Sequence, residues 1–422
     1  MIDTKTNITQ TIIDSLSTSG NKVSFMPDAS VLDAVRFLEE KGIPNAKHEE
    51  YKYCNLEAVF RRDFKSISNQ FSSQLGVAGH KLAGCINLVL VNGTYHAELS
   101  DKAEGITVST LHEADKAILA KHLSRYADVN ADAFVAMNTA FCSSGLFIHI
   151  RGVAEKPIHI LNVISANGIS LVNPRQLIIA EKNAEATLIE SFISEGDAPA
   201  VFHNHLTEIF VDENAKIKSY RLQQEGSKVT QVNTTEAIVK RYGNYTTNTF
   251  TFGGSLVRNN LHVVLADDHG EAHLNGLFVT GGSQLVDNHT LVDHQKPNCE
   301  SNELYKGIAK DKSTGIFNGK IFVRKDAQKT NAYQSSKNIL LSDDATINTK
   351  PQLEIYADDV KCSHGTSTGK VDENALFYLK ARGIGDASAR RLLLQAFAQE
   401  LIEKVEVEVL QERILYLFEK AL

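Results

Sequence analysis

The sequence predicts a mainly β protein with a helical region at each end. From about Asn138 onward, short apolar or alternating runs separated by Asn, Asp and Gly continue for roughly 200 residues, as expected for many short strands. Helical spacing of apolar residues occurs before residue 75 and again after Val371. We therefore divide the chain into a mainly helical region with a short β segment (1–137), a β core (138–370) and a helical C-terminal domain (371–422).

Near the N-terminus, Ser30 is a candidate helix cap, and Gly42 and Pro44 end the segment that follows it. The apolar residues at helical spacing in this segment are Val31, Leu32, Val35 and Leu38. Further on, the run CINLVLVNGTY contains Asn92-Gly93, which predicts a hairpin turn. A helix is expected between Leu111 and Tyr126.

The β core contains a loose internal repeat. Its apolar markers are Ile179, Phe210, Val239 and Val264, at intervals of 31, 29 and 25 residues. Each marker is followed by a polar turn, at Lys182-Asn183, Glu213-Asn214, Tyr242-Gly243-Asn244 and Asp267-Asp268-His269-Gly270. The repeat favours a solenoid of strands, in which each turn buries its inward residues against its neighbours. A β-sandwich remains the alternative, because its strands also recur regularly.

The C-terminal domain is predicted to consist of consecutive helices. A helix beginning around Leu376 ends near Gly383 and Gly385, and Asp386 is a candidate N-cap for the next one. This second helix carries an apolar stripe of Leu394, Phe397, Leu401 and Val405. A later stripe comprises Leu410, Ile414, Leu417 and Phe418. Such stripes either pack on each other and on the β body or bind a partner protein.

Composition excludes several classes of protein. With 44 Lys and Arg against 51 Asp and Glu, the net charge of −7 argues against a dedicated nucleic-acid binder. The apolar run from Ile86 to Val91 is far shorter than the roughly 20 residues that span a bilayer, so no membrane partner is expected. The N-terminus lacks a secretory pattern, which points to the cytoplasm. Five widely spaced cysteines without a CxxC motif predict neither a disulfide framework nor a zinc ribbon.

Glycine-rich and histidine-rich segments are the first candidate ligand sites. The sequence GTSTGK, residues 365–370, is too short between its glycines for a phosphate-binding loop and has Val371 where Ser or Thr is required. The pairs Gly253-Gly254 and Gly281-Gly282 are better explained as turns. Histidines cluster along the β core, at His203, His205, His262, His269, His273, His289 and His294, the last of these near Cys299. His203 and His205 would share one face of a strand, as metal ligands must, but most of these histidines are expected to be structural.

Cys362 and His364 form a candidate site of a different kind. They are separated by Ser363, so both side chains project from one face if the backbone is extended. A thiolate and an imidazole together can bind a soft metal, or the imidazole can activate the sulfur. Two ligands are too few for a closed site, so others would have to come from elsewhere, including another subunit. The alternative is a buried Cys and a structural His.

The segment around this pair, PQLEIYADDVKCSHGTSTGKVDENALFYLKARGI (residues 351–384), resembles the SufD branch of the SufB/SufD family of iron-sulfur cluster assembly. GIPNAKHEEYKY (42–53) and CESNELYKGIAKDKSTGIFNGKIFV (299–323) are similar to other parts of that family. Ser363 and Gly365 flank His364 where SufB has acidic residues in an EHEA-like motif, which favours SufD.

The resemblance implies a right-handed parallel β-helix between helical terminal regions. It also implies a non-catalytic subunit that pairs with SufB through the β-helix and docks the ATPase SufC, with the stripe Leu394, Phe397, Leu401 and Val405 as the expected contact. His364, with Cys362 beside it, would face SufB at the interface where iron is acquired and a cluster forms. No stably bound cofactor is expected in the isolated chain, only transient iron or a nascent cluster in the complex.

Alternatives are a SufB-like scaffold that carries the cluster itself, an independent iron-binding metallochaperone, and a homodimer of the isolated chain. A polysaccharide-degrading β-helix enzyme is disfavoured, because Asp358 and Asp359 would point to opposite faces and no secretory signal is present.

Overall fold

The computed structural model describes residues 13, 25–61, 65–66, 76–142, 144–166, 168–196 and 200–422. Of the region before residue 75 that was predicted to be helical, residues 1–12, 14–24, 62–64 and 67–75 lie outside these ranges. None of the helices in the described ranges is long and apolar enough to cross a bilayer.

The first long helix is α2, Asp28–Lys41, and it begins before the predicted cap. Pro27 occupies the N-cap position, so Ser30 lies inside the helix and the cap prediction is wrong. Gly42 ends α2 with a φ of 68°, as predicted. The predicted helix from Leu111 to Tyr126 is shorter than expected, because Asp115 caps its start. The other helical elements here are η1 (Glu49–Tyr51), η2 (Val59–Arg61), η3 (Val77–His80), η4 (Ala97–Leu99), α3 (Lys116–His122) and α4 (Ala133–Phe141).

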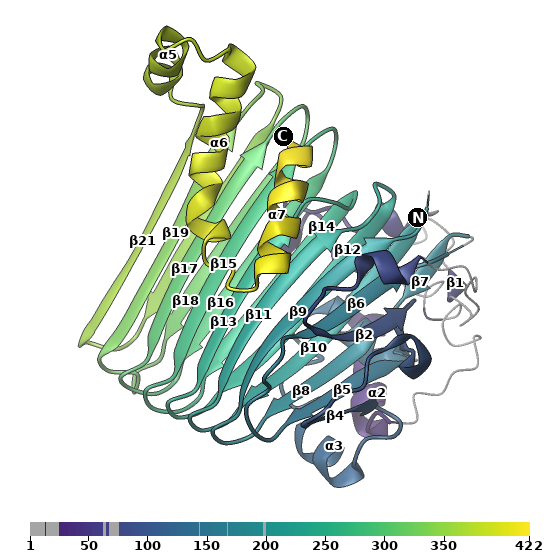
Figure 1. Cartoon of the computed structure of the whole chain (residues 1–422). Coiled ribbons are helices and arrows are strands. Elements are labelled where there is room, and N and C mark those ends of the chain that lie inside the picture. Colours follow the sequence, from purple (N-terminus) through teal and green to yellow (C-terminus); the bar gives the residue numbers. More distant parts are fainter. Residues whose placement is uncertain are drawn as a thin grey trace, which may run out of the picture.

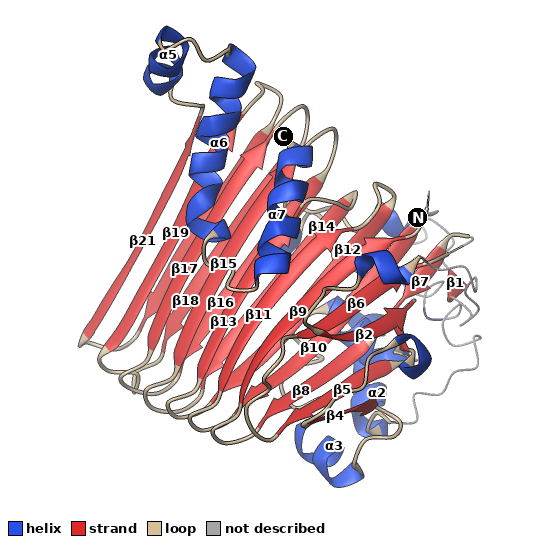
Figure 2. Ribbon diagram, in the orientation of Figure 1, coloured by secondary structure: helices blue, strands red, loops and turns tan. Residues whose placement is uncertain are grey.

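Two long sheets form the body of the molecule (Figures 1 and 2). In the sheet that we call sheet A, the neighbouring strands are β20 (Thr346–Ile355), β18 (Thr314–Val323), β16 (Leu285–His294), β14 (Leu256–Leu265), β12 (Val229–Val239), β10 (Val201–Val211), β8 (Arg175–Ala180), β5 (Gly145–Ile150) and β4 (Ile106–Thr110), with β7 (Ser170–Val172) and β1 (Lys65–Ser66) at the side. In sheet B they are β21 (Val360–Gly369), β19 (Thr330–Leu340), β17 (Glu300–Ala309), β15 (Glu271–Thr280), β13 (Asn244–Thr251), β11 (Lys216–Gln224), β9 (Glu185–Ser194), β6 (Ile158–Ile164), β2 (Ile86–Val91) and β3 (Thr94–Tyr95).

From β8 and β9 onward, successive strands of the chain alternate between the two sheets, and within each sheet they pair in parallel. This is a parallel β-helix, so the solenoid prediction is confirmed and the β-sandwich alternative is wrong. The repeat markers lie at nearly equivalent positions in neighbouring strands. Phe210 pairs with the previous marker, Ile179, whereas Val239 and Val264 each pair with the residue next to the previous marker. The displacement contributes to the drift of the repeat interval.

One corner of the β-helix is built from residues with left-handed backbone conformation. Asn183, Asn214, Tyr242, His269, Asn298 and Lys329 all have φ between 56° and 64°. Each N–H donates to a carbonyl of the next turn, for example Asn214 N to Arg241 O at 2.9 Å and Tyr242 N to Asp268 O at 3.2 Å. Stacked turns therefore continue the hydrogen bonding of the sheets around the corner. The polar turns predicted from the sequence are these corners.

Strands within residues 1–137 already belong to both sheets. β2 pairs with β6 in sheet B, and β4 pairs antiparallel with β5 in sheet A. The predicted hairpin at Asn92-Gly93 joins β2 to β3, and the two turn residues have φ of 49° and 81°. Both values are left-handed, as a type I′ turn requires.

Side chains from the inner faces of both sheets fill the lumen of the β-helix. The apolar part of this core includes Ile148 on β5 and Ile160 on β6, which are fully buried, and it extends to Tyr305 and Phe317 near the C-terminal end. On the outside, α2 and α4 cover the N-terminal part of sheet A, where Phe134 of α4 packs on a phenylalanine of β10. The lumen is therefore a packed core rather than a channel.

The C-terminal helices are α5 (Glu373–Ala381), α6 (Asp386–Ile402) and α7 (Glu408–Ala421). Gly385 is the N-cap of α6, so Asp386 is the first residue of the helix and not its cap. The Asp386 carboxylate instead pairs with Lys380 and Arg390. Helices α6 and α7 lie across the outer face of sheet B, whereas α5 stands beyond the ends of the strands (Figure 1).

Candidate functional site at the open end of the β-helix

The two sheets end at strands β20 and β21, and within the described ranges neither strand has a partner on its outer edge. Every residue of β20 is partly or fully exposed, and β21 is mostly exposed. The unpaired N–H and C=O groups of such an edge can pair with a strand of another chain. The C-terminal end of the β-helix is therefore open.

Cys362 and His364 lie on β21 and face the lumen side of this end. In the parallel register they stand opposite Ala332 and Gln334 of β19. Those two residues are buried, whereas their neighbour Tyr333 is exposed, so the side containing Ala332 and Gln334 is the inner one. Because side chains alternate along an extended strand, Cys362 and His364 share this inner side.

The environments of the two side chains differ. Cys362 packs with the small apolar cluster that includes Ile321 and Ala332, and burial raises the pKa of its thiol. The sulfur is thus held in the thiol form, and the sulfur activation by His364 that the sequence suggested has no support in this arrangement. His364 is exposed at the rim. The site offers one accessible imidazole beside one protonated thiol.

Two further polar residues lie behind His364. Gln334 is the register neighbour of His364, and Glu303 on β17 is the register neighbour of Gln334. Burial raises the pKa of Glu303 to about 7, although the hydrogen bond from Thr290 lowers it. Sequence reasoning missed both residues, because the only signal for them is the register between turns.

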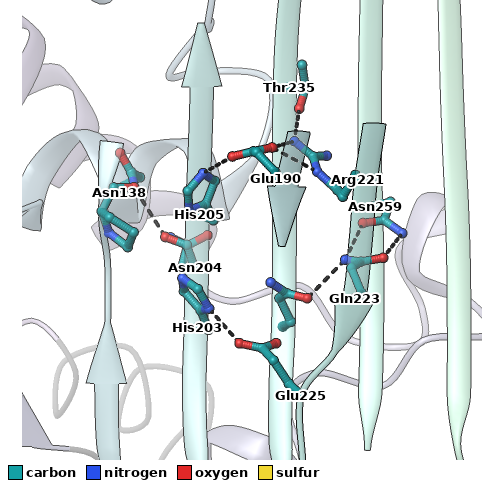
Figure 3. Close-up of polar contacts among 12 residues, drawn as sticks. Asn138, Glu190, His203, Asn204, His205, Arg221, Gln223, Glu225, Thr235 and Asn259 are labelled. Atoms are coloured by element: carbon teal, nitrogen blue, oxygen red, sulfur yellow. Dashed lines mark hydrogen bonds and ion pairs between the residues drawn. The ribbon is translucent and has the colours of Figure 1, made fainter. Parts of the chain in front are cut away.

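The histidines of the middle section are mostly engaged by carboxylates. His203 and His205 do share the lumen face of β10, but they turn to different partners (Figure 3). His203 Nδ1 lies 3.0 Å from Glu225, and His205 Nε2 lies 3.3 Å from Glu190. Burial raises the pKa of Glu190, but the Arg221 guanidinium and the His205 ring together outweigh burial and lower that pKa to about 2.

Outside the lumen, His289 joins the N-terminal segment to sheet A. Its ring lies between Asp287 and Glu50, at 2.9 and 3.3 Å, beside a cavity of about 370 Å³. Burial lowers the pKa of His289, but Asp287 and Glu50 together raise it above the usual value. His262 pairs with Glu236 at 2.8 Å on the same face.

The other histidines of the β core are also accounted for by their surroundings. His294 bonds Ser301 in the lumen, and His273 lies near Glu271. His269 stacks on the Tyr242 ring at a corner. These contacts agree with the expectation that most of the histidines are structural.

Two candidates remain, the thiol of Cys299 and the glycine-flanked segment 365–370. The Cys299 thiol contacts the Asp267 carbonyl at 3.2 Å. Residues 365–369 continue strand β21 and form no phosphate loop. Among the described residues, no three His, Cys, Asp or Glu side chains are grouped to hold a metal ion.

The predicted docking stripe faces the β body. Leu394, Leu401 and Val405 are buried, and Phe397 is partly buried. They pack with residues on the outer face of sheet B, namely Tyr220, Leu222, Phe250, Leu277 and Ile308. The stripe therefore attaches the helical domain to the β-helix.

Other residues of the helical domain are exposed. The large apolar side chains that it presents to solvent are Phe377, Tyr378, Leu392 and Tyr416. An ion pair of 2.6 Å between Lys306 and Glu400 further fixes α6 to sheet B. The surface left for a partner thus comprises α5 and the outer sides of α6 and α7.

Comparison with known families agrees with this architecture. The model described as "SufBD protein N-terminal region" matches residues 25–160, and the one described as "SUF system FeS cluster assembly, SufBD core domain" matches residues 162–397. This chain belongs to the SufBD family. The core match includes Glu303, Gln334, Cys362 and His364, and it extends through α5 into α6.

Individual members of the SufBD family are similar over most of their length. The iron-sulfur cluster assembly protein SufD of Escherichia coli is 32% identical over 379 residues, which cover 89% of this chain and 88% of that protein. An iron-sulfur cluster assembly SufBD family protein of Synechocystis is 32% identical, with 88% and 86% covered. The chloroplastic protein ABCI7 of Arabidopsis thaliana is 27% identical, with 94% and 86% covered. The similarity to SufD confirms the resemblance seen in the sequence.

Proposed function

We propose that this chain is a SufD-type, non-catalytic subunit of a SUF iron-sulfur cluster assembly complex. Its open end pairs with a SufB-type subunit, and His364 is presented to the place where iron is acquired and a nascent cluster forms. The observation that carries the proposal is the position of His364, which is exposed on the inner side of an unpaired edge strand. Membership of the SufBD family supports it.

A single accessible imidazole suits a site that two chains complete together. Iron and iron-sulfur clusters take several ligands, and the imidazole and thiolate of proteins are among them. His364 and Cys362 supply two at most, and no further His, Cys, Asp or Glu of the described chain completes a ligand group with them. A partner docked on β20 and β21 would bring its own ligands to this rim.

The helical domain is proposed to bind the ATPase subunit SufC. Phe377 and Tyr378 on α5 are 74% and 58% exposed and stand away from the β body. Helix α6 connects them to sheet B through its buried stripe, so movement of a bound ATPase would be transmitted to the β-helix as a rigid-body shift. In this proposal, nucleotide hydrolysis in the partner changes the geometry at the open end.

Replacement of His364 by Ala tests the proposal. We expect cluster yield in the reconstituted complex to fall about tenfold or more, as for loss of a metal ligand or its supporting residue. Complex assembly, followed by size-exclusion chromatography, should be unchanged, because the side chain is exposed. The control is His273→Ala on the outer face of sheet B, which should leave yield unaffected. Wild-type cluster yield in the His364 variant would overturn the proposal.

A further inference from the structure

Behind His364, the inner face of sheet B carries a short row of polar side chains. Gln334 lies one strand inward from His364, and Glu303 lies one strand inward from Gln334. Both side chains are 3% exposed. Immediately beyond them the neighbours are apolar: Leu274 follows on β15, and the Tyr305 ring stacks on a phenylalanine of β18 at 4.7 Å between centroids. Glu303 is therefore the acidic group at the inner end of this row.

Gln334 is held in place but its amide is not satisfied. A Cβ at Gly319 would overlap Gln334 Nε2, so the amide rests directly against this glycine. Neither Gln334 Oε1 nor Nε2 has a hydrogen-bond partner within the described chain, and Glu303 Oε1 also has none there. Buried polar atoms without partners are costly, so the Gln334 amide and the Glu303 carboxyl group gain stability from any partner that reaches them.

Glu303 has no charged neighbour that fixes its ionisation. Thr290 Oγ1 donates to Glu303 Oε2 at 2.6 Å, and burial is the main influence on the carboxyl pKa, which it raises to about 7. The facing groups are Leu274 on β15, Thr290 on β16 and Gln334 on β19, and none of them titrates. Tyr305 on the same strand is the nearby titratable group; burial raises its pKa first, and Glu303 raises it further.

We propose that Glu303, acting through Gln334, is a positioning residue for the His364 imidazole at the open end. Ionised Glu303 attracts the NH₂ group of Gln334, which leaves the amide oxygen to accept the imidazole N–H and frees the other ring nitrogen for iron. Protonated Glu303 donates to the amide oxygen, so the NH₂ group faces outward and donates to the near ring nitrogen, which leaves the N–H on the nitrogen that iron would need. The inference rests on the proposed function of His364.

The test is an anaerobic ferrous iron titration of the full chain in complex with its partner subunits, from about pH 6 to about pH 8, a range that brackets the carboxyl pKa of Glu303. We expect iron affinity of the wild type to rise across this range. Glu303→Gln should reduce that rise and lower affinity about tenfold at the upper pH, as for loss of an outer-shell partner. Gln334→Met, which removes the amide, should have the same effect.

The control is Glu225→Gln, another buried carboxylate, which follows β11 and so lies several strands of sheet B away from β17. This variant should leave the pH profile unchanged. If His364→Ala impairs iron binding but wild type, Glu303→Gln and Gln334→Met have identical pH profiles, the inference is overturned and the proposed function stands. If His364→Ala binds iron normally, the proposed function itself fails and the inference with it.

Discussion

Glu303 lowers the stability of the fold that contains it. Its pKa rises from the usual 4.5 to about 7 because burial disfavours the charged carboxylate. A residue of this kind is rarely kept for packing, since Gln or Leu would occupy the lumen without the cost of desolvating a charge. The destabilisation is therefore consistent with a functional role for Glu303 beside the open end.

The stability cost has a definite pH dependence. Because the folded pKa of Glu303 lies above the unfolded one, the folded state binds more protons between pH 4.5 and about 7, and stability falls as pH rises through this window. Glu303→Gln removes this loss, so the variant should be more stable than the wild type by about 3 kcal/mol at about pH 8 and similar to it near pH 4. Denaturant unfolding at both pH values measures the difference. An equal difference at the two pH values would contradict the predicted ionisation.

At the scale of elements, helix α6 shows what an amphipathic pattern can and cannot predict. Leu394 and Leu401 on α6 follow from spacing alone and are buried together with Val405, although the helix ends at Ile402 and Val405 lies in the turn after it, not in the helix as predicted. The pattern contains no information on what covers the stripe, and the cover is sheet B of the same chain. Capping residues are equally ambiguous. Ser30 and Asp386 are residue types that favour an N-cap, but both lie inside their helices, whose N-cap positions are occupied by Pro27 and Gly385.

The helical domain provides a pair of contrasting substitutions. Phe377→Ala on α5 removes an exposed ring, so binding of the ATPase subunit should weaken at least about tenfold with little change in stability. Leu401→Ala on α6 removes a buried side chain and should destabilise the packing of the domain on sheet B by about 2 to 5 kcal/mol. Calorimetric binding and thermal unfolding distinguish the two effects. Unchanged ATPase affinity in Phe377→Ala would place the docking surface elsewhere.

At the scale of the whole molecule, the solenoid was predictable because its turns repeat. Polar corner residues such as Asn183 and Asn214 follow each apolar marker and adopt the left-handed conformation that Asn tolerates. Tyr242 adopts it too, although its residue type does not predict it. The row from Glu303 to His364 could not be predicted, because corners of varying length change the register between turns.

The open end makes a last prediction for the complex as a whole. Unpaired edges on β20 and β21 allow pairing with a SufB-type chain or with a second copy of this chain. The substitutions Ser367→Lys and Thr368→Lys, at two exposed positions of β21, would place a charge on each side of the edge strand. They should prevent either association. Light scattering after size-exclusion chromatography measures the mass of the isolated chain and of its mixture with the partner subunit.

The control is Thr246→Lys on β13, on the outer face of sheet B, which should associate as the wild type does. If the Ser367→Lys, Thr368→Lys variant also associates as the wild type does, then the partner binds another surface.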